Sequence, residues 1–338
     1  MLFENVAVVG LTHVDAPEVI PSSRFETRLA GTMERLRLPL GMLSQVAGVE
    51  SRRWWSEGVK PSDAATLAAE KLLEEVRVPR ERIGLVVNTS VCRDYIEPST
   101  ACLVHSKLGL APHCQNFDLG NACLAFMNAM DIAGALIERG EIEYALVVDG
   151  ESSRFVQEQT MERLTGPDVD LDIFRQEFAT LTLGSGSVAM ILAHRDLVDE
   201  PHLYRGAVSV AASEWSHLCE GQVDYMKTDT RTLLAEGVKL ACRTYEIASE
   251  ILGWTTGCLD ELVLHQVSAV HTGKLCEALG LDIGNALLTF PELGNVGPAS
   301  VPITLSKAVE AGRITRGSRV GLLGIGSGLN CSMAELVW

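Results

Sequence analysis

The sequence is poor in the features that assign a protein to a class at once. Its nine cysteines include no Cys-x-x-Cys pair, which argues against a zinc site and against a disulfide framework. The N-terminus carries no basic region of a secretory signal, and no apolar run approaches the roughly 18 residues of a membrane span. Scattered, unpaired thiols are typical of a reducing compartment, so we expect a cytoplasmic protein without a transmembrane segment.

Positive charge is also scarce. The chain has 28 Lys and Arg against 44 Asp and Glu, and its net charge of −16 argues against binding to nucleic acid or to an anionic membrane. A phosphorylated ligand would need a local basic patch on such a surface. By contrast, 47% of the 338 residues are hydrophobic, enough to bury a large core in two domains or two similar halves.

Among the cysteines, Cys123 has the most informative position. It closes the segment 118–123, Asp-Leu-Gly-Asn-Ala-Cys, and a helical pattern follows from Leu124 to Arg139. The unpaired N–H groups and the dipole of a helix start favour a thiolate, so we expect a lowered thiol pKa and a nucleophile for acyl groups. The alternative is that Cys123 is one more buried small apolar residue, as most free cysteines are.

Helical patterns alternate with short, β-branched apolar runs. Asp63 can cap the first of these helices, and Pro79 follows its end. The predicted elements are a helix over 63–78, a strand over 83–88, a helix over 124–139 and a strand over 144–148. This alternation predicts an α/β fold with mainly parallel sheets that are buried on both faces.

An ordered duplication divides the chain. Leu-Gly-Leu at 108–110, Leu-Gly-Asn at 119–121 and a helix ending near 140 recur as Leu-Gly-Leu at 279–281, Leu-Gly-Asn at 293–295 and a helix ending near 312. We therefore expect an N-terminal half over 1–200 and a C-terminal half over 201–338. Equivalent turns of such a pseudo-dimer face each other, which predicts that Cys123 and Asn295 share a pocket. The polar stretch 155–178 is expected to be an irregular surface insertion that covers a site or builds a subunit interface.

Two glycine-rich stretches, at 184–186 and 324–330, invite a dinucleotide-binding interpretation. Apolar, strand-like residues follow the first, and too little chain follows the second for a βαβ unit, so neither has the required context. Both fit tight turns between strands. The stretch 324–330 also fits a loop that brings backbone N–H groups to a ligand, which acyl transfer needs for the thioester oxyanion.

Three polar residues occupy positions where functional residues are common. His265 ends the apolar strand 262–264, although a satisfied core histidine fits that place equally well. Asn295 by itself fits a structural turn residue, and only its equivalence to the Cys123 turn in the repeat makes it a candidate site residue. Glu97 fits an exposed residue at a helix entry; in an apolar acyl pocket its pKa would rise and it would serve as a base. The remaining histidines of interest, expected to be structural, are His105, His113 and His271.

The set of Cys123, His265 and Asn295 resembles the Cys–His–Asn triad of thiolase-superfamily condensing enzymes, specifically the ketoacyl synthase III branch. The matching segments, in chain order, are Gly48–Arg53, Pro98–Cys102, Asn121–Cys123, His265–Gln266, Gly294–Gly297 and Gly326–Gly328. The resemblance covers nearly the whole chain. It implies a thiolase fold, with two similar α/β halves in a five-layered αβαβα core. The tryptophan that such synthases place against adenine has no match near residues 41–47, so no residues for coenzyme A are carried over.

Within this branch the chain most resembles the condensing enzymes of bacterial long-chain olefin biosynthesis. His265-Gln266-Val267-Ser268 with His271-Thr272, and Glu97 before its Pro-Ser segment, carry that resemblance. It implies a head-to-head condensation of two fatty acyl-CoA molecules, the second of which has no carboxylate to lose. A base must then take its α-proton, and the resemblance assigns that role to Glu97 of the partner subunit in an obligate homodimer.

The resemblance implies a role for each residue. Cys123 accepts the first acyl group, and the backbone N–H groups of Cys123 and Gly328 hold its oxyanion. His265 and Asn295 hold the thioester oxygen of the second acyl-CoA, whose enolate attacks the acyl-enzyme. Hydrolysis then gives a 2-alkyl-3-keto acid. Coenzyme A is part of the substrate, no other cofactor and no metal is expected, and downstream biosynthetic enzymes are candidate partners.

Two alternatives stay open. A decarboxylative condensation of acyl-CoA with a malonyl thioester needs no base, so Glu97→Ala would leave it active. A non-catalytic thiolase-fold partner of a biosynthetic complex would be marked by a lost nucleophile, whereas the three residues of the triad are all present here.

Overall fold

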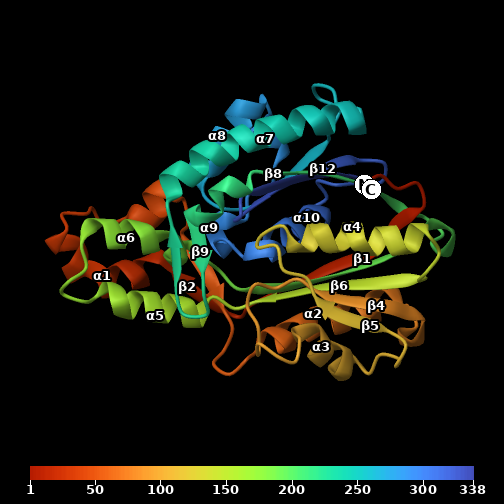
Figure 1. Ribbon diagram of the computed structural model, residues 1–338, viewed down its shortest axis with the longest axis horizontal. Helices are drawn as coiled ribbons and strands as arrows, with labels where there is room; N and C mark the ends of the chain where they lie inside the picture. Colours follow the sequence, from red (N-terminus) through yellow and green to blue (C-terminus); the bar gives the residue numbers. More distant parts are fainter.

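The computed structural model describes all 338 residues and arranges them in five layers (Figure 1). Two outer helical layers and one central helical layer enclose the strands. The helices of these layers are, from one face to the other, α7 (Thr230–Leu252) with α8 (Ala269–Leu279), α4 (Ala125–Glu138) with α10 (Ser300–Glu310), and α2 (Pro61–Val76) with α3 (Thr100–Leu108). The predicted αβαβα order is confirmed.

Nine strands form one continuous sheet in the order β11-β12-β13-β8-β1-β7-β6-β4-β5. Their bounds are β1 (Val6–Asp15), β4 (Ile83–Asn88), β5 (Gln115–Asp118), β6 (Tyr144–Glu151), β7 (Gly186–His194), β8 (His202–Ala211), β11 (Glu261–Leu264), β12 (Arg319–Gly326) and β13 (Asn330–Val337). Only β4–β5, β4–β6 and β11–β12 pair in parallel. The prediction of mainly parallel sheets is wrong, because β7 and β13 return antiparallel to the strands before them and need no helical crossover.

The strand order is the same on both sides of the contact between β1 and β8. On one side it runs β1-β7-β6-β4-β5, and on the other β8-β13-β12-β11, so each unit places its first strand beside its last. A single bridge from Leu262 to Ala286 stands where β5 has its counterpart. This arrangement brings α4 and α10 together in the central layer, where their apolar side chains share the largest core cluster.

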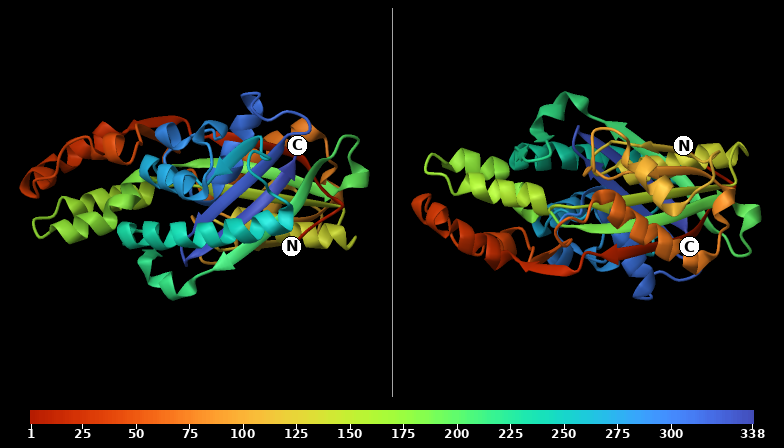
Figure 2. Two further views of the ribbon diagram at one scale, coloured as in Figure 1. Left: turned by 90° about the horizontal axis from the view of Figure 1, so that it is seen from above. Right: turned by 90° about the horizontal axis from the view of Figure 1, so that it is seen from below.

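The segment 155–178 is largely helical, so the prediction that it is irregular is wrong. Helices α5 (Arg154–Leu164) and α6 (Leu171–Glu177) project from one end of the molecule beside α1 (Ser22–Arg35) (Figure 2). Phe174 and Leu164 are buried there against Phe25 and Leu29 of α1. The apolar residues of the segment are too few for a clear helical period, and they become a core only against a partner far away in the chain.

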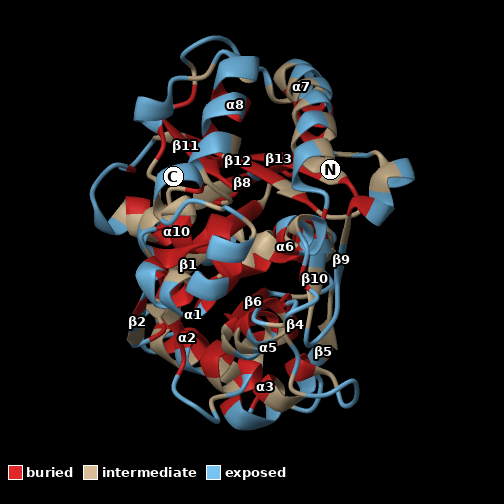
Figure 3. Ribbon diagram, turned by 90° about the vertical axis from the view of Figure 1, so that its left-hand side faces the viewer, coloured by how far each residue is buried: buried red, intermediate tan, exposed pale blue.

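The remaining elements are short or peripheral. They are β2 (Glu18–Pro21), β3 (Ser51–Trp54), β9 (Cys219–Gly221), β10 (Met226–Thr228) and α9 (Phe290–Leu293). Burial follows the layers: β4, β6, β7, β11, β12 and β13 are almost entirely buried, β1 and β8 are partly buried, and the outward faces of α7, α8 and α3 are exposed (Figure 3). None of the helices combines the length and the hydropathy needed to cross a membrane.

Candidate active site

Cys123 lies in the turn that leads from β5 into α4. Ala122 adopts a left-handed conformation with φ +44°, and the side chain of Asn121 donates to Asn128 Oδ1 at 2.6 Å, which ties the turn to the helix. The backbone N–H of Cys123 donates to no other residue. The turn therefore presents a thiol together with an unused backbone donor, and the residue keeps some accessible surface.

The predicted lowering of the Cys123 pKa is wrong. Burial, with smaller contributions from nearby Cys219 and Glu151, raises the pKa of the Cys123 thiol to about 12. Helix α4 begins at Ala125, two residues beyond the cysteine, and desolvation of a thiolate outweighs the dipole of that helix start. At neutral pH the resting protein holds a neutral thiol, which must lose its proton as it attacks.

The loop between β12 and β13 lies against the Cys123 turn. A Cβ atom on Gly326 would stand 3.3 Å from the backbone nitrogen of Cys123, and Asn330 Nδ2 donates to Asn121 Oδ1 at 3.4 Å. Gly328 has φ +125°, and its N–H donates to no other residue. The flanking strands form an antiparallel hairpin, so the loop is no dinucleotide site and instead brings backbone to the cysteine.

The Asn295 turn is held by the other glycine stretch. Asn295 N donates to Thr182 O, and Gly184 N donates to Asn295 O, both at 2.9 Å. A Cβ atom on Gly184 would stand 1.8 Å from Leu293 O, so only glycine allows this approach. Asn295 Oδ1 accepts from Gly297 N at 3.0 Å, while Nδ2 donates to no protein group. The amide is therefore oriented by its oxygen, and its N–H₂ is free to bind a ligand oxygen.

His265 follows the last residue of β11, and its side chain is 3% exposed. Its backbone N donates to Leu323 O at 2.9 Å, which fixes the residue to β12. The buried Nδ1 has no partner, so the interpretation as a satisfied core histidine is wrong. Burial, with a smaller contribution from His271, lowers the pKa of His265 to about 3. The imidazole is neutral at physiological pH and offers one N–H donor.

His271 belongs beside His265, although its sequence position indicates only a structural residue. It lies in the first turn of α8, where Ser268 Oγ accepts from its backbone N at 3.2 Å. Its Nδ1 is also buried without a partner, and burial lowers the pKa of His271 to about 4. The other two histidines are structural as predicted, since His105 Nε2 bonds Ala111 O and His113 Nε2 bonds Glu81 O, each at 3.1 Å.

Gln266 is a second residue whose part the sequence does not reveal. Its side chain is buried and spans from β11 to the loop before Asn295. Nε2 donates to Leu287 O at 3.2 Å, and Oε1 accepts from Thr289 N at 3.0 Å. Gln266 therefore sets the distance between the His265 strand and the Asn295 turn. In the sequence, its place next to His265 and in the segment that carries the family resemblance points to it, but not its bridging role.

Contacts along β12 and β6 bring the three triad residues to one end of the central layer. Leu323 of β12 holds His265, and three residues later Gly326 lies against Cys123. Glu151, the last residue of β6, lies within the electrostatic reach of Cys123 and stands 3.5 Å from a Cβ placed on Gly297.

Glu97 is not part of this cluster within one subunit. It lies on the exposed loop between β4 and α3, and its side chain makes no hydrogen bond or ion pair there. Its neighbour Ile96 is 95% exposed, and Tyr95 and Val91 are also exposed. Three apolar side chains thus face solvent on the loop that carries this carboxylate.

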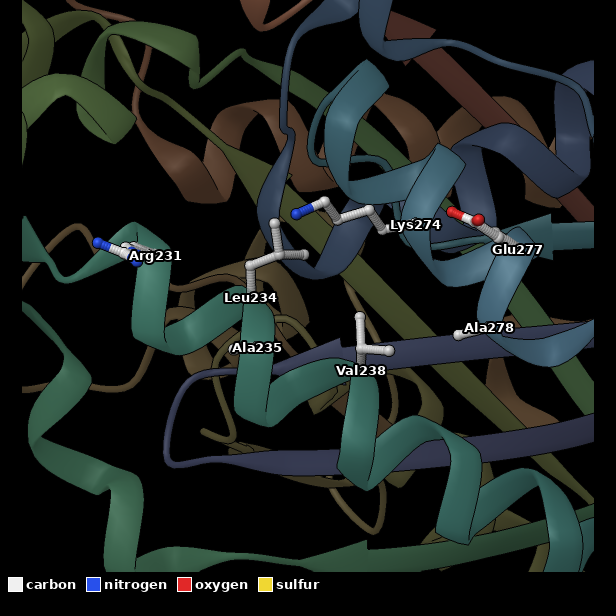
Figure 4. A pocket seen from close by; sticks show the side chains of 7 residues that line it. All are labelled: Arg231, Leu234, Ala235, Val238, Lys274, Glu277 and Ala278. Carbon is white, nitrogen blue, oxygen red and sulfur yellow. The ribbon is translucent and has the colours of Figure 1, made fainter.

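A groove of about 460 Å³ lies outside the cluster, between α7 and α8 (Figure 4). Arg231 of α7 and Lys274 of α8 line it opposite the single acid Glu277, and the Lys274 side chain points toward α7. This groove supplies positive charge on a chain whose net charge is −16. No three histidine, cysteine or acidic side chains gather in a way that would hold a metal ion.

Comparison with known proteins agrees with this geometry. Residues 117–166 match the 3-oxoacyl-acyl-carrier-protein synthase III family, and residues 250–338 match the C-terminal domain of the same synthases. Over all 338 residues the chain is 52% identical to the acyl-CoA:acyl-CoA alkyltransferase of Xanthomonas campestris pv. campestris, and each chain covers 100% of the other. The chain belongs to the OleA family of acyl-CoA:acyl-CoA alkyltransferases. The relative from Shewanella oneidensis is 36% identical, again over 100% of both chains.

Solved structures of the family share the whole fold. The OleA of X. campestris with bound lauric acid and lauroyl-CoA superposes with a TM-score of 0.98 at 52% identity and 100% coverage of both chains. A cerulenin-bound structure of that protein gives the same TM-score over 100% of this chain and 98% of that one. Further structures of the X. campestris protein carry a single substitution of a glutamate, a cysteine or a histidine. This OleA-family chain therefore has the thiolase fold.

Proposed function

We propose that this enzyme condenses two long-chain fatty acyl-CoA molecules head to head, without decarboxylation, to a 2-alkyl-3-keto acid. The observation that carries the proposal is the 52% identity, over the full length of the chain, to an acyl-CoA:acyl-CoA alkyltransferase. The chain also has an acid, Glu97, that a decarboxylating enzyme does not need. The glutamate, cysteine and histidine substituted in the X. campestris structures have the same spacings along the chain as Glu97, Cys123 and His265, which supports these three residues as the working set.

The first step transfers an acyl group to Cys123. The Sγ atom attacks the thioester carbon, the carbon–sulfur bond to coenzyme A breaks, and the thiol proton ends on the departing coenzyme A. The free backbone N–H groups of Cys123 and Gly328 are the donors for the oxyanion of this step. A neutral thiol suits a pocket for fatty acyl chains, because a resting thiolate would have to be desolvated there.

The second step activates the second acyl-CoA. His265 and Asn295 each offer one donor, the imidazole N–H and Nδ2, to its thioester oxygen. These donors stabilise the enolate that forms when the α-proton leaves. The enolate carbon then attacks the acyl-enzyme, Cys123 leaves as a thiolate and regains a proton, and water hydrolyses the product thioester.

The base for the α-proton is Glu97 of the partner subunit. The exposure of Glu97 in a single subunit, and of Ile96 beside it, supports a loop that inserts into a second copy. Insertion of the loop would bring the carboxylate to the α-carbon of the bound acyl-CoA, within the reach that a general base needs. The active enzyme is therefore a homodimer with one complete site per cysteine.

The proposal also covers the division of the chain into two halves and the cellular compartment of the enzyme. The repeated strand order supports a division into halves at 1–200 and 201–338. The nine free cysteines support a cytoplasmic enzyme. Coenzyme A enters only as part of the substrate, and the reaction as written needs no metal and no redox group.

Product analysis by mass spectrometry tests the proposal. A mixture of two acyl-CoA chain lengths should give all four 2-alkyl-3-keto acids, each retaining both carboxyl-derived carbons, and malonyl-CoA should neither be required nor be incorporated. The decarboxylative alternative would instead give products extended by two carbons, only with malonyl-CoA. A purified enzyme that forms no acyl adduct from any acyl-CoA would favour the non-catalytic alternative.

A further inference from the structure

The loop that carries Glu97 has few attachments of its own. Residues 91–99 connect β4 to α3, and most of their side chains are exposed. In the middle of the loop, Asp94 accepts from Ser62 N at 2.8 Å and from Ser62 Oγ at 2.6 Å, at the start of α2. At its beginning, Glu151 accepts from Val91 N at 2.5 Å and from Cys92 N at 3.4 Å. Glu151 is thus the one buried carboxylate that holds this loop.

Glu151 is an unusual anchor, because it lies in a pair of buried acids. It is 5% exposed, and Asp149, two residues earlier on the same face of β6, is fully buried. Thr89 Oγ1 donates to Asp149 Oδ2 at 2.6 Å, while Asp149 Oδ1 has no partner, and no lysine or arginine pairs with either acid. Burial raises the pKa of both carboxyls; Glu151 raises that of Asp149 further, whereas the hydrogen bonds from Cys92 and Val91 partly offset the shift of Glu151. Two buried acids without a cation destabilise a fold, so they are better explained by function.

The position of Glu151 allows two different roles. Its carboxylate stands next to Gly297, 3.5 Å from a Cβ placed there, and it lies near Cys123, so it borders the active site of its own subunit. Its hydrogen bonds, however, run to the loop of Glu97. Glu151 makes no hydrogen bond to Gly297, whereas its bonds from the two backbone N–H groups fix where the loop leaves the sheet.

We propose that Glu151 is a positioning residue for Glu97, and that it therefore acts on the active site of the partner subunit. The inference rests on the proposed function, in which Glu97 works across the dimer. It makes a specific claim: a defect at Glu151 behaves as a defect of the base in the other subunit, although Glu151 itself borders the cysteine of its own subunit.

Subunit mixing separates the two roles. Glu151→Ala homodimers should still acylate Cys123 at close to the wild-type rate, while condensation falls at least ~10-fold. Mixed dimers of Glu151→Ala with Cys123→Ala should recover up to about half of wild-type activity, since one site combines an intact cysteine with an intact, anchored Glu97 loop. Mixed dimers of Glu151→Ala with Glu97→Gln should recover nothing, because both variants lack the same contribution.

Two further variants check that the effect is positional. Glu151→Gln keeps an oxygen for Val91 N and should retain most of the condensation. Glu335→Ala is the matched control, because Glu335 is equally buried but holds Trp254 and Arg319 in the other half of the chain. A loss caused by Glu335→Ala should stay with the subunit that carries it and should not recover with Cys123→Ala. If Glu151→Ala dimers do not fold, Glu151→Asp, one methylene shorter, takes their place with the same expected pattern.

The pairing of Glu97→Gln with Cys123→Ala distinguishes a failure of the inference from a failure of the proposed function. If that pair recovers activity and the pair with Glu151→Ala does not, Glu151 serves its own subunit and the inference is wrong. If neither pair recovers although subunit exchange is verified, Glu97 does not act across the dimer, and the proposed function loses that step.

Discussion

The turns before α4 and α10 occupy equivalent places in the two strand units but are built for different tasks. In the first, Cys123 presents a thiol and an unused backbone N–H, with Ala122 in a left-handed conformation. In the second, Gly294 and Gly297 take the positive φ angles, and Asn295 presents a free amide N–H₂. In the proposed reaction, the two equivalent turns therefore divide the work: the first supplies the nucleophile and the second supplies a hydrogen-bond donor.

Cys123 and His265 nevertheless share one electrostatic condition, which sets them apart from Glu97. Burial raises the pKa of Cys123 to about 12 and lowers that of His265 to about 3, so both groups are neutral at rest. A pocket that desolvates long acyl chains disfavours every fixed charge. A carboxylate base is the one charged group that the proposed reaction needs, and Glu97 lies outside on an exposed loop. The predictions below test this division of labour.

Removing the nucleophile breaks the first turn and should have the largest effect. Cys123→Ala should lower both acylation and condensation by at least ~10³-fold, since no second nucleophile stands in that turn. With the wild-type enzyme, peptide mass spectrometry after incubation with a long-chain acyl-CoA should find the adduct on Cys123. An adduct on Cys92 or Cys114, with Cys123 unmodified, would overturn the mechanism.

Removing the base should slow condensation but not acylation, which distinguishes the role of the exposed loop from the roles of both turns. Glu97→Gln keeps the shape of the side chain but not its basicity, so Cys123 should still be acylated. Condensation should fall on the order of 10³-fold, within the usual range for a positioned base. Single-turnover measurements of adduct formation and of product release give the two rates separately. Undiminished condensation of two acyl-CoAs would show that another group takes the α-proton, and undiminished condensation only with malonyl-CoA would support the decarboxylative alternative.

Removing a hydrogen-bond donor should affect the condensation step alone. His265→Ala or Asn295→Ala each deletes one hydrogen bond to the developing oxyanion, worth about 3 kcal/mol, so condensation should fall ~10²-fold. Acylation of Cys123 should persist in both variants. A folded variant that no longer acylates would show that the second half also serves the first step, and the division between the turns would be wrong.

The smallest expected effect concerns stability against acid. The folded-state pKa values of His265 and His271, about 3 and about 4, lie below the usual 6.5, so the unfolded chain binds the protons more readily. The stability that these neutral imidazoles contribute is complete above pH ~6.5 and is lost as the pH falls toward the folded values. His271→Gln should therefore reduce the loss of unfolding free energy between pH 7 and pH 5 by about 1–2 kcal/mol. Urea unfolding at the two pH values measures this difference, and equal losses in both proteins would contradict it.

The local sequence pattern was enough to predict four of the helices and strands and the order of the motifs. The expected helix over 63–78 is α2 at Pro61–Val76, and the strand over 83–88 is β4 with the same bounds. Likewise α4 and β6 lie where periodicity indicates them. These results depend on residues a few positions apart, whose apolar spacing and capping act within one element. The ordered recurrence of Leu-Gly-Asn similarly needed no tertiary information to indicate two equivalent turns.

What depended on distant contacts could not be read from the sequence. The helical state of 155–178 requires burial against α1, and the hydrogen bonds of Glu151 join β6 to a loop 60 positions earlier. The pKa of Cys123 was expected to fall with the helix dipole, which is local, but desolvation by the assembled layers decided its sign. The sequence by itself determined which chemical groups the chain has and in which elements they lie. Only the tertiary structure decided which of them are neutral, which lack partners and which hold the others in place, because burial and hydrogen bonding are properties of neighbours in space.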